Sequence, residues 1–324
     1  MHLGVSGVFA FLPHSLRRIY TILQMKNYLV RICLLLTACT LLLTACGTEG
    51  TKLPDLSTLG KVVAIAREEG SGTRAEFDTM LSTNQAAADA VAASTIDVLQ
   101  QVGQEKNAIG YLAHSTLPQE LAAVKVLKVN GIEPDINNIS SGKYALRRSY
   151  YLAYNGELNP LQEDFLQYIF CAGQKLVAKK SIAVGAPTTF LSSRVSGKLV
   201  IKGSSSATSL VNELAQEYMQ LNPRAQVSVV VTDSSSGLTS AIRRECDFAI
   251  SSRELKRYEK ELLTSKAFAR DAIVLIVNKH NPINNLSTKQ IKALYETCNE
   301  WKSMNLGREE NKKLSLWLYF LWRE

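Results

Sequence analysis

Histidine is scarce in this sequence of 324 residues, and the common motifs of catalytic and metal sites are missing from it. His2 and His14 precede the expected start of the mature chain, and His114 and His280 lie outside any motif for an activated nucleophile. There is no GxxxxGKS/T phosphate loop, no HExxH and no CxxC. The sequence therefore predicts a protein that is not an enzyme and has no metal or cofactor, with His114 and His280 at its surface.

Long runs of lysine and arginine are also absent, although the formal net charge is +8. Four basic residues, Arg17, Arg18, Lys26 and Arg31, precede Cys46 with no acidic residue among them, and removing their charges leaves +4. A mild and dispersed positive charge argues against nucleic-acid binding. It is compatible with an anionic ligand.

The sequence has no disulfide framework. Three of its six cysteines lie in the first 46 residues, and the other three, Cys171, Cys246 and Cys298, are far apart and odd in number. Neither paired disulfides nor metal spacing follows from such a set, so these three are expected to be small core residues.

The N-terminal region carries a targeting pattern. From Met25 the basic segment MKNYLVR precedes an apolar stretch from Ile32 to Leu43, and small residues then lead to Cys46. This pattern resembles a bacterial lipoprotein signal, in which Cys46 becomes the acylated N-terminus. We predict a signal region over 1–46, starting at Met25, a linker over 47–60, and a lipid anchor on the extracytoplasmic face of a bacterial membrane. A plain transmembrane anchor is the alternative.

Apolar runs typical of strands alternate with helical patterns along the rest of the chain. The expected strands are Val62–Ala66, Asn107–Leu112, Val124–Val129, Arg147–Tyr154, Leu199–Ile201, Gln226–Val231, Phe248–Ile250 and Ala272–Val277. Such alternation predicts an α/β architecture with a mostly parallel sheet. One helix is expected to carry Leu161 through Leu176, and another to begin at a capping box of Ser287 and Gln290.

Four turns rich in small polar residues each follow an expected strand and precede a helical stretch: 71–73, 204–206, 234–237 and 251–253. In α/β sheets ligands bind outside the carboxyl ends of the strands, so these turns can face one cleft. Hydroxyl groups, backbone N–H groups and helix N-termini favour an anion, and Arg67 adds a planar fork of donors.

Four sequence segments together resemble the phosphate-binding proteins of ABC importers, which have a two-lobe periplasmic-binding-protein-like type II fold. They are REEGSGTR from Arg67, KGSSS from Lys202, DSSSG from Asp233 and DFAISSREL from Asp247, and the similarity extends from about Lys61 to Trp301. The resemblance implies capture of phosphate, or a similar tetrahedral oxyanion, in an interlobe cleft, with an ABC permease as partner. It implies these ligand-binding residues: Arg67, Ser71, Gly72, Thr73, Ser205, Ser206, Ser235 and Ser252, with Glu69 bracing Arg67.

The sequence departs from that family in two ways. Ser252 stands where some members have an aspartate that accepts a proton from phosphate, which weakens the expected discrimination against sulfate; Asp233 is a nearby alternative acceptor. The GSGTR lobe, predicted over 61–147, precedes the serine-rich lobe, predicted over 148–301, whereas the family order is the reverse. This order indicates either a circular permutation with one direct crossing between complete lobes or a piece of a tandem protein, followed by an atypical tail over 302–324. A tethered module that senses or scavenges anions without feeding a transporter is the alternative function.

Overall fold

The structure is a computed structural model that describes residues 55–85, 88–298 and 300–304. The predicted signal, Cys46, most of the linker and most of the predicted tail lie outside these residues. Within them, no helix is both long and apolar enough to cross a bilayer. The described residues all belong to one compact unit.

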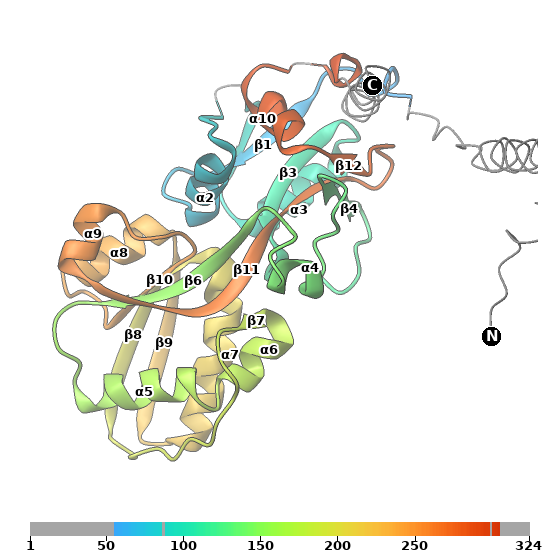
Figure 1. The fold of residues 1–324 in the computed structure, drawn as a ribbon. Coiled ribbons are helices and arrows are strands. Elements are labelled where there is room, and N and C mark those ends of the chain that lie inside the picture. Colours follow the sequence, from blue (N-terminus) through green and yellow to red (C-terminus); the bar gives the residue numbers. More distant parts are fainter. Residues whose placement is uncertain (1–54, 86–87, 299, 305–324) are drawn as a thin grey trace, which may run out of the picture. The chain divides into compact units, whose positions relative to one another are not determined.

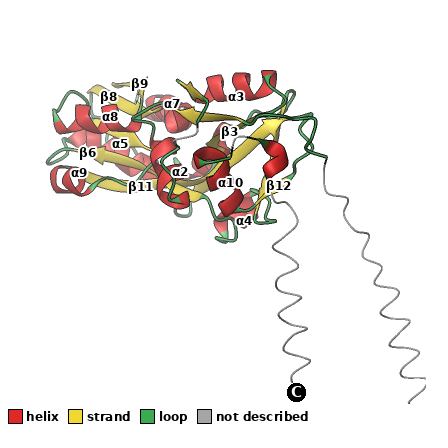
Figure 2. Ribbon diagram, turned by 90° about the horizontal axis from the view of Figure 1, so that it is seen from above, coloured by secondary structure: helices red, strands yellow, loops and turns green. Residues whose placement is uncertain are grey.

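The described chain has an α/β fold, as predicted, with helices on both sides of its strands (Figure 2). The strands are β1 (Val63–Arg67), β2 (Ala90–Ala92), β3 (Ala108–Ala113), β4 (Val124–Val126), β5 (Lys128–Val129), β6 (Arg147–Tyr154), β7 (Ile182–Ala183), β8 (Gly197–Ser204), β9 (Ala225–Thr232), β10 (Phe248–Ser251), β11 (Thr264–Asn278) and β12 (Asn285–Leu286). The α-helices are α2 (Gly72–Leu81), α3 (Thr95–Gln104), α4 (Ile136–Ser140), α5 (Pro160–Phe170), α6 (Gln174–Lys180), α7 (Ser205–Leu221), α8 (Ser234–Ile242), α9 (Arg257–Leu262) and α10 (Thr288–Glu296). Short 3-10 turns occur at His114–Thr116 and Trp301–Ser303.

The main sheet has the strand order β2-β1-β3-β11-β6-β10-β8-β9. Parallel pairing, which we predicted for most of the sheet, holds for β1 with β2 and β3, and for β8 with β9 and β10. The central strand β11 instead runs antiparallel to both β3 and β6. The reason is that the chain passes between the two halves of the sheet twice, in β6 and again in β11, and the return must run in the opposite direction.

Strand β11 ties the two halves together (Figure 1). Its first part, Thr264–Ala272, pairs with β6, and its second part, Ile273–Asn278, pairs with β3 and β4. Within the second part, Ile273–Val277 is a continuous apolar run with no exposed residue, as expected for a strand covered on both faces. We predicted one direct crossing between the lobes, but the chain crosses twice, in the adjacent strands β6 and β11.

The boundaries of the two lobes differ from the predicted ones, because the chain goes back to the first half of the sheet in β11 and the second lobe therefore ends before residue 301. Residues 272–304 share buried clusters with residues 56–146, and we call this body the first lobe. Residues 147–271 form the second lobe, whose two clusters lie on both sides of β10. The end of the predicted linker also belongs to the first lobe, because Leu56 and Leu59 are buried in its core.

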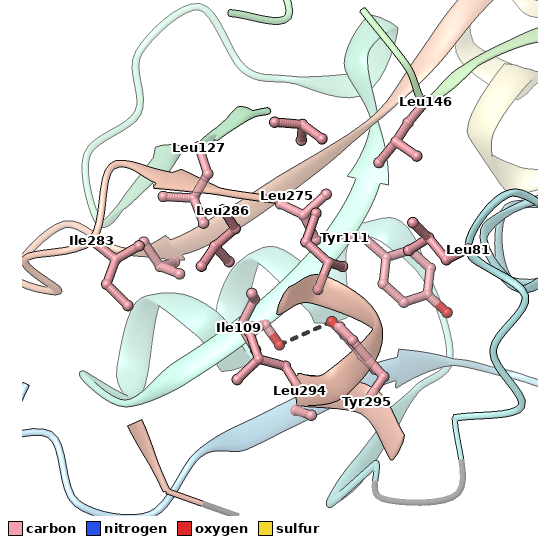
Figure 3. Close-up of a cluster of buried hydrophobic side chains, with 14 of the residues drawn as sticks. Leu81, Ile109, Tyr111, Leu127, Leu146, Leu275, Ile283, Leu286, Leu294 and Tyr295 are labelled. Atoms are coloured by element: carbon pink, nitrogen blue, oxygen red, sulfur yellow. Dashed lines mark hydrogen bonds between the residues drawn. The ribbon is translucent and has the colours of Figure 1, made fainter. Parts of the chain in front are cut away.

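The core of the first lobe is built around aromatic side chains from distant segments (Figure 3). The rings of Phe77 and Tyr111 stack with centroids 4.0 Å apart, and Tyr295 packs edge-on against both. The Tyr295 hydroxyl donates to the Ile109 carbonyl (3.4 Å), which holds α10 beneath β3. The predicted capping box of Ser287 and Gln290 is present at the start of α10.

The two ends of the first lobe meet beside this core. Trp301 is buried, its indole N–H donates to the Asn107 carbonyl (2.8 Å), and its backbone N–H donates to the Gly60 carbonyl (3.1 Å). Lys61 and Glu300 form an antiparallel bridge. Residues from either end of the described chain thus contribute to one body.

In the second lobe, α5 and α7 cover one face of the sheet. The predicted long helix from Leu161 to Leu176 is divided into α5 and α6 at Cys171–Gly173. Gly173 allows the tight turn there, since a Cβ at this position would lie 3.0 Å from the Tyr168 carbonyl. The expected strand Val124–Val129 is likewise divided, because β4 pairs with β11 whereas β5 pairs with β12.

The cysteines and histidines of the described residues lie apart from one another. Cys171, Cys246 and Cys298 are free and half-buried rather than fully in the core, and burial raises the pKa of Cys246 to about 11. His280 is exposed, as predicted, and His114 is half-buried. Among the residues that the structure describes, no group of three or more His, Cys, Asp and Glu side chains could hold a metal ion.

Candidate anion-binding site

The four polar turns gather at the interface of the two lobes. Parallel pairing aligns the ends of β8, β9 and β10, so their turns lie along one edge of the second lobe. The turn after β1 comes from the first lobe and faces them. Direct contacts join the two sides: the Thr73 and Ser206 hydroxyls are 2.8 Å apart, and the Ser235 N–H donates to the Gly70 carbonyl (3.3 Å).

Three helices begin at this interface. Helix α2 starts at Gly72, α7 at Ser205 and α8 at Ser234, each directly after the strand or turn that precedes it. The first N–H groups of a helix have no partner within the helix, and they carry its positive dipole end. Residues at these helix starts contact one another across the interface, as in the pairs Thr73–Ser206 and Gly70–Ser235. Helix N-termini that lie close together create a positive potential without any mobile side chain, which suits an anion.

Glycine brings the backbones close together here. A Cβ on Gly72 would lie 2.3 Å from the Ser234 Oγ and 2.5 Å from the Ser252 Oγ. Gly203, at the end of β8, has φ +143°, and a Cβ there would lie 2.2 Å from the Ile250 carbonyl oxygen. Both close approaches require the absence of a side chain.

The hydroxyl groups form a connected cluster. Ser204 donates to the Ser252 Oγ (2.8 Å), and the Ser252 N–H donates to the Ser234 Oγ (3.1 Å). Of the residues predicted from sequence, the structure places Thr73, Ser206 and Ser252 at this cluster, all of them buried. Ser71 is buried at the start of α2, where its side chain accepts from the Arg74 N–H (3.4 Å) as the N-cap.

Ser235 is engaged elsewhere. Its hydroxyl accepts from the Arg253 guanidinium (3.2 Å), and Arg253 in turn forms a buried ion pair with Glu259 (2.8 Å). Although burial opposes the charge on Glu259, the Arg253 hydrogen bonds keep the pKa of this carboxyl below its usual value. The hydroxyl that this turn contributes to the cluster is that of Ser234.

Arg67 lies at the base of the site with only 1% of its surface exposed. Its backbone N–H donates to the Tyr111 hydroxyl (3.1 Å), and its guanidinium donates to the hydroxyls of Thr95 (3.2 Å) and Ser205 (3.0 Å). Arg67 and Ser205 come from different lobes, so this arginine spans the interface.

The carboxylate that braces Arg67 is Glu68, and the prediction of Glu69 was wrong. Both Glu68 oxygens accept from the Arg67 guanidinium at 2.7 Å, whereas Glu69 is exposed. Glu68 continues the extended chain, because its N–H donates to the Ala92 carbonyl (3.0 Å). Glu69 already belongs to the turn that Gly70 completes with φ +89°, and this turn carries its side chain away from the arginine.

Asp233, which we considered as an acceptor for a phosphate proton, instead caps the start of helix α8. Its carboxylate accepts from the backbone N–H (2.8 Å) and the hydroxyl (2.5 Å) of Ser236, and it caps α8. It lies beside Gly70 rather than in the hydroxyl cluster. Both of its oxygens are therefore already hydrogen-bonded.

Arg148 is a second buried arginine at the cluster, and it is not among the site residues predicted from the sequence. One of its terminal nitrogens, Nη1, donates to the Thr73 hydroxyl (2.8 Å) and to the Ser252 carbonyl (3.3 Å). Asp271 on β11 forms its ion pair at 3.6 Å. Alternation along β6 was the available signal, because it places Arg148 on the same face as the buried Tyr150 and Leu152.

The charges at the site are balanced. Arg67 is paired with Glu68 and Arg148 with Asp271, so the side chains contribute almost no net charge. Burial, together with the adjacent Asp271 carboxylate, raises the pKa of Tyr150 far above its usual value, and its hydroxyl remains a neutral donor to Asp271. An anion at this interface would therefore depend on N–H groups, hydroxyls and helix ends.

Comparison with known proteins gives consistent matches. The sequence matches the PBP superfamily domain over residues 54–172 and 188–316. It is 33% identical over 271 residues to the phosphate-binding protein PstS 2 of Streptococcus agalactiae, which covers 78% of this chain and 89% of that protein. PstS 2 of Streptococcus pneumoniae is 31% identical over 266 residues, with 78% and 90% covered.

A solved structure agrees with these sequence matches. The crystal structure of a phosphate-binding protein of a phosphate ABC transporter from Streptococcus pneumoniae aligns with a TM-score of 0.63 at 30% identity, over 76% of this chain and 100% of that chain. A single alignment along nearly the whole of a relative requires the same order of segments in both proteins. The order that we describe as permuted is thus shared with PstS 2.

Proposed function

This chain belongs to the PBP superfamily, and on that premise we propose that it is an extracytoplasmic binding protein that captures phosphate between its lobes for an ABC importer. The relatives with which it aligns over most of their length carry the names of phosphate-binding proteins, one of them from a phosphate ABC transporter. A binding role, rather than a catalytic one, is consistent with these names.

One structural observation supports the proposal most directly. The N-termini of α2, α7 and α8 converge with two buried arginines and a cluster of hydroxyls at the interface of two lobes. Such groups are donors, and a tetrahedral oxyanion is an acceptor with several oxygens that can each receive two or more hydrogen bonds. We propose that phosphate is bound by these residues: Arg67, Ser71, Gly72, Thr73, Ser205, Ser206, Ser234 and Ser252. Ser235 then supports the site through Arg253.

We propose that the lobes move apart and together by bending of β6 and β11. These strands cross between the lobes, and the contacts between Thr73 and Ser206 and between Arg67 and Ser205 join the lobes in the arrangement seen here. Hinge closure around a ligand buries it among fixed donors.

Calorimetric titration of the full-length protein in detergent with phosphate, arsenate and sulfate tests this function. We expect phosphate and arsenate to bind, because they share geometry and charge. We expect sulfate to compete measurably, since Asp233 is already hydrogen-bonded and Ser252 replaces the acidic position. If none of the three anions bound, the proposed function would be wrong.

We also propose that Cys46 is acylated and anchors the protein to the extracytoplasmic face of the membrane. Support comes from the basic, apolar and small-residue pattern between Met25 and Cys46. Mass spectrometry of the protein expressed in a bacterial host should find acyl chains on an N-terminal Cys46. An unmodified Cys46 within an uncleaved chain would contradict the anchor and leave phosphate binding untouched.

A further inference from the structure

Arg148 lies at the point where the chain passes between the lobes. It is the second residue of β6 and is directly opposite Asp271 in the pairing of β6 with β11. The side chains of both residues are only 1% exposed. A charged pair buried this deeply between two crossing strands needs a reason beyond folding, because apolar residues of similar volume often serve stability as well or better.

The contacts of Arg148 reach both sides of the anion site. Its Nη1 atom donates to the Thr73 hydroxyl in the first lobe (2.8 Å) and to the Ser252 carbonyl in the second lobe (3.3 Å). One nitrogen atom therefore joins the turn after β1 to the turn after β10. These two bonds can coexist only when the lobes are together.

The bond to Thr73 also fixes the direction of a hydroxyl. A guanidinium can only donate hydrogen bonds, so the Thr73 oxygen must accept from Arg148 and its own proton is directed elsewhere. The Ser206 hydroxyl, 2.8 Å away, is the neighbour on that side. Because the Thr73 oxygen already accepts from Arg148, its proton is free to be donated to another acceptor at the interface, which is what an oxyanion requires.

Asp271 holds Arg148 without using all of its donors. The Asp271 carboxylate accepts from the Ser115 N–H (2.9 Å) and the Tyr150 hydroxyl (2.5 Å), and lies farther from Arg148, at 3.6 Å. The Arg148 Nε is buried and has no hydrogen-bond partner among the residues that the structure describes. Buried polar groups are nearly always paired, so an arginine left incompletely paired beside a hydroxyl cluster indicates a functional constraint.

We propose that Arg148 is a positioning residue of the anion site: it orients the Thr73 hydroxyl as a donor and links the two turns when the lobes close. This inference rests on the proposed function. Arg148 acts through Thr73 and Ser252, and Asp271 fixes its place on the crossing strands.

The test compares phosphate affinity in variants of the full-length protein, measured by calorimetry in detergent. We expect R148M to raise the Kd for phosphate by about tenfold or more, because a hydrogen bond to a charged group is lost. The matched control is R147M, which removes the same charge from the adjacent, exposed residue of β6 and should leave the Kd near that of the wild type. A double-mutant cycle with T73V measures whether Arg148 acts through Thr73, in which case the two losses are not additive.

Each outcome is decisive. If the wild type does not bind phosphate, the proposed function and this inference both fail. If the wild type binds but R148M is indistinguishable from R147M, this inference alone fails. The loss of phosphate affinity caused by T73V is compared in the wild type and in R148M. A smaller loss in R148M supports the inference. Equal losses in the two backgrounds would overturn it, even if the variants unfold at different temperatures. Should R148M not fold, R148K is judged by the same comparison, because an ammonium group cannot reproduce the geometry of the fork.

Discussion

Replacement of Gly203 by alanine should destabilise the protein by roughly 3 to 5 kcal/mol, combining overpacking with a strained backbone conformation. The added Cβ would lie 2.2 Å from the Ile250 carbonyl oxygen and 2.8 Å from the Ile250 nitrogen. Both are backbone atoms of the neighbouring strand β10, which cannot turn away as a side chain can. The φ angle of +143° adds strain for any residue with a Cβ.

Urea unfolding of the two proteins measures this effect. The matched control is Gly131→Ala, because Gly131 also has a positive φ (+79°) but a Cβ there would meet nothing within 4 Å. The control isolates the backbone strain, which is about 1 kcal/mol or slightly more. If the two variants lost the same free energy of unfolding, the added Cβ at Gly203 would be accommodated by a small separation of β8 and β10 that costs no stability. That result would contradict the close packing seen here.

The second large effect is expected at Arg67. Arg67→Ala should weaken phosphate binding by about 3 kcal/mol, or more than 100-fold, since a charge-assisted donor is lost and the Glu68 carboxylate is left without its partner. The unpaired Glu68 carboxylate would then lie at the proposed site and repel a bound anion. Calorimetry with phosphate measures the loss.

A double variant separates the two causes. Arg67→Ala combined with Glu68→Gln removes the repulsion and should recover part of the affinity that Arg67→Ala loses. Arg257→Ala is the control for a charge lost far from the site, because its side chain is 96% exposed. An unchanged affinity in Arg67→Ala would show that Arg67 serves the fold rather than the ligand.

Local patterns in the sequence predicted the strands and turns that carry the candidate site. Strand β6 occupies the predicted span Arg147–Tyr154, and each of the four polar turns follows a strand as expected. These features depend on alternation, apolar runs and small residues within a few positions, which any single sequence displays. The convergence of the turns followed from the rule that ligands bind at the carboxyl ends of strands.

Features that depend on distant pairing were not predicted. The first part of β11 contains Lys266, Arg270 and Asp271 and lacks an apolar run, so only its pairing with β6 makes it a strand. The return of residues 272–304 to the first lobe follows from that pairing. The role of Arg148 was hidden for the same reason, since its partner Asp271 is 123 residues away and becomes its neighbour only across the two strands.

Which of Glu68 and Glu69 pairs with Arg67 depends on the conformation of a single turn. Two consecutive acidic residues follow Arg67, and their sequence positions do not decide which carboxylate turns back toward the guanidinium. The left-handed conformation of Gly70 and the hydrogen bond from Glu68 to Ala92 decide it. Backbone geometry of this kind is set by the fold around the turn.

The bridge between Lys61 and Glu300 has a consequence for how this fold can be encoded. Because the two ends of the first lobe are joined by this bridge, the backbone of the folded body is close to a ring. A gene specifies where such a ring is opened, and the opening does not alter which strands pair or which turns meet at the interface. Two proteins whose genes begin at different points of the ring can therefore share one binding site.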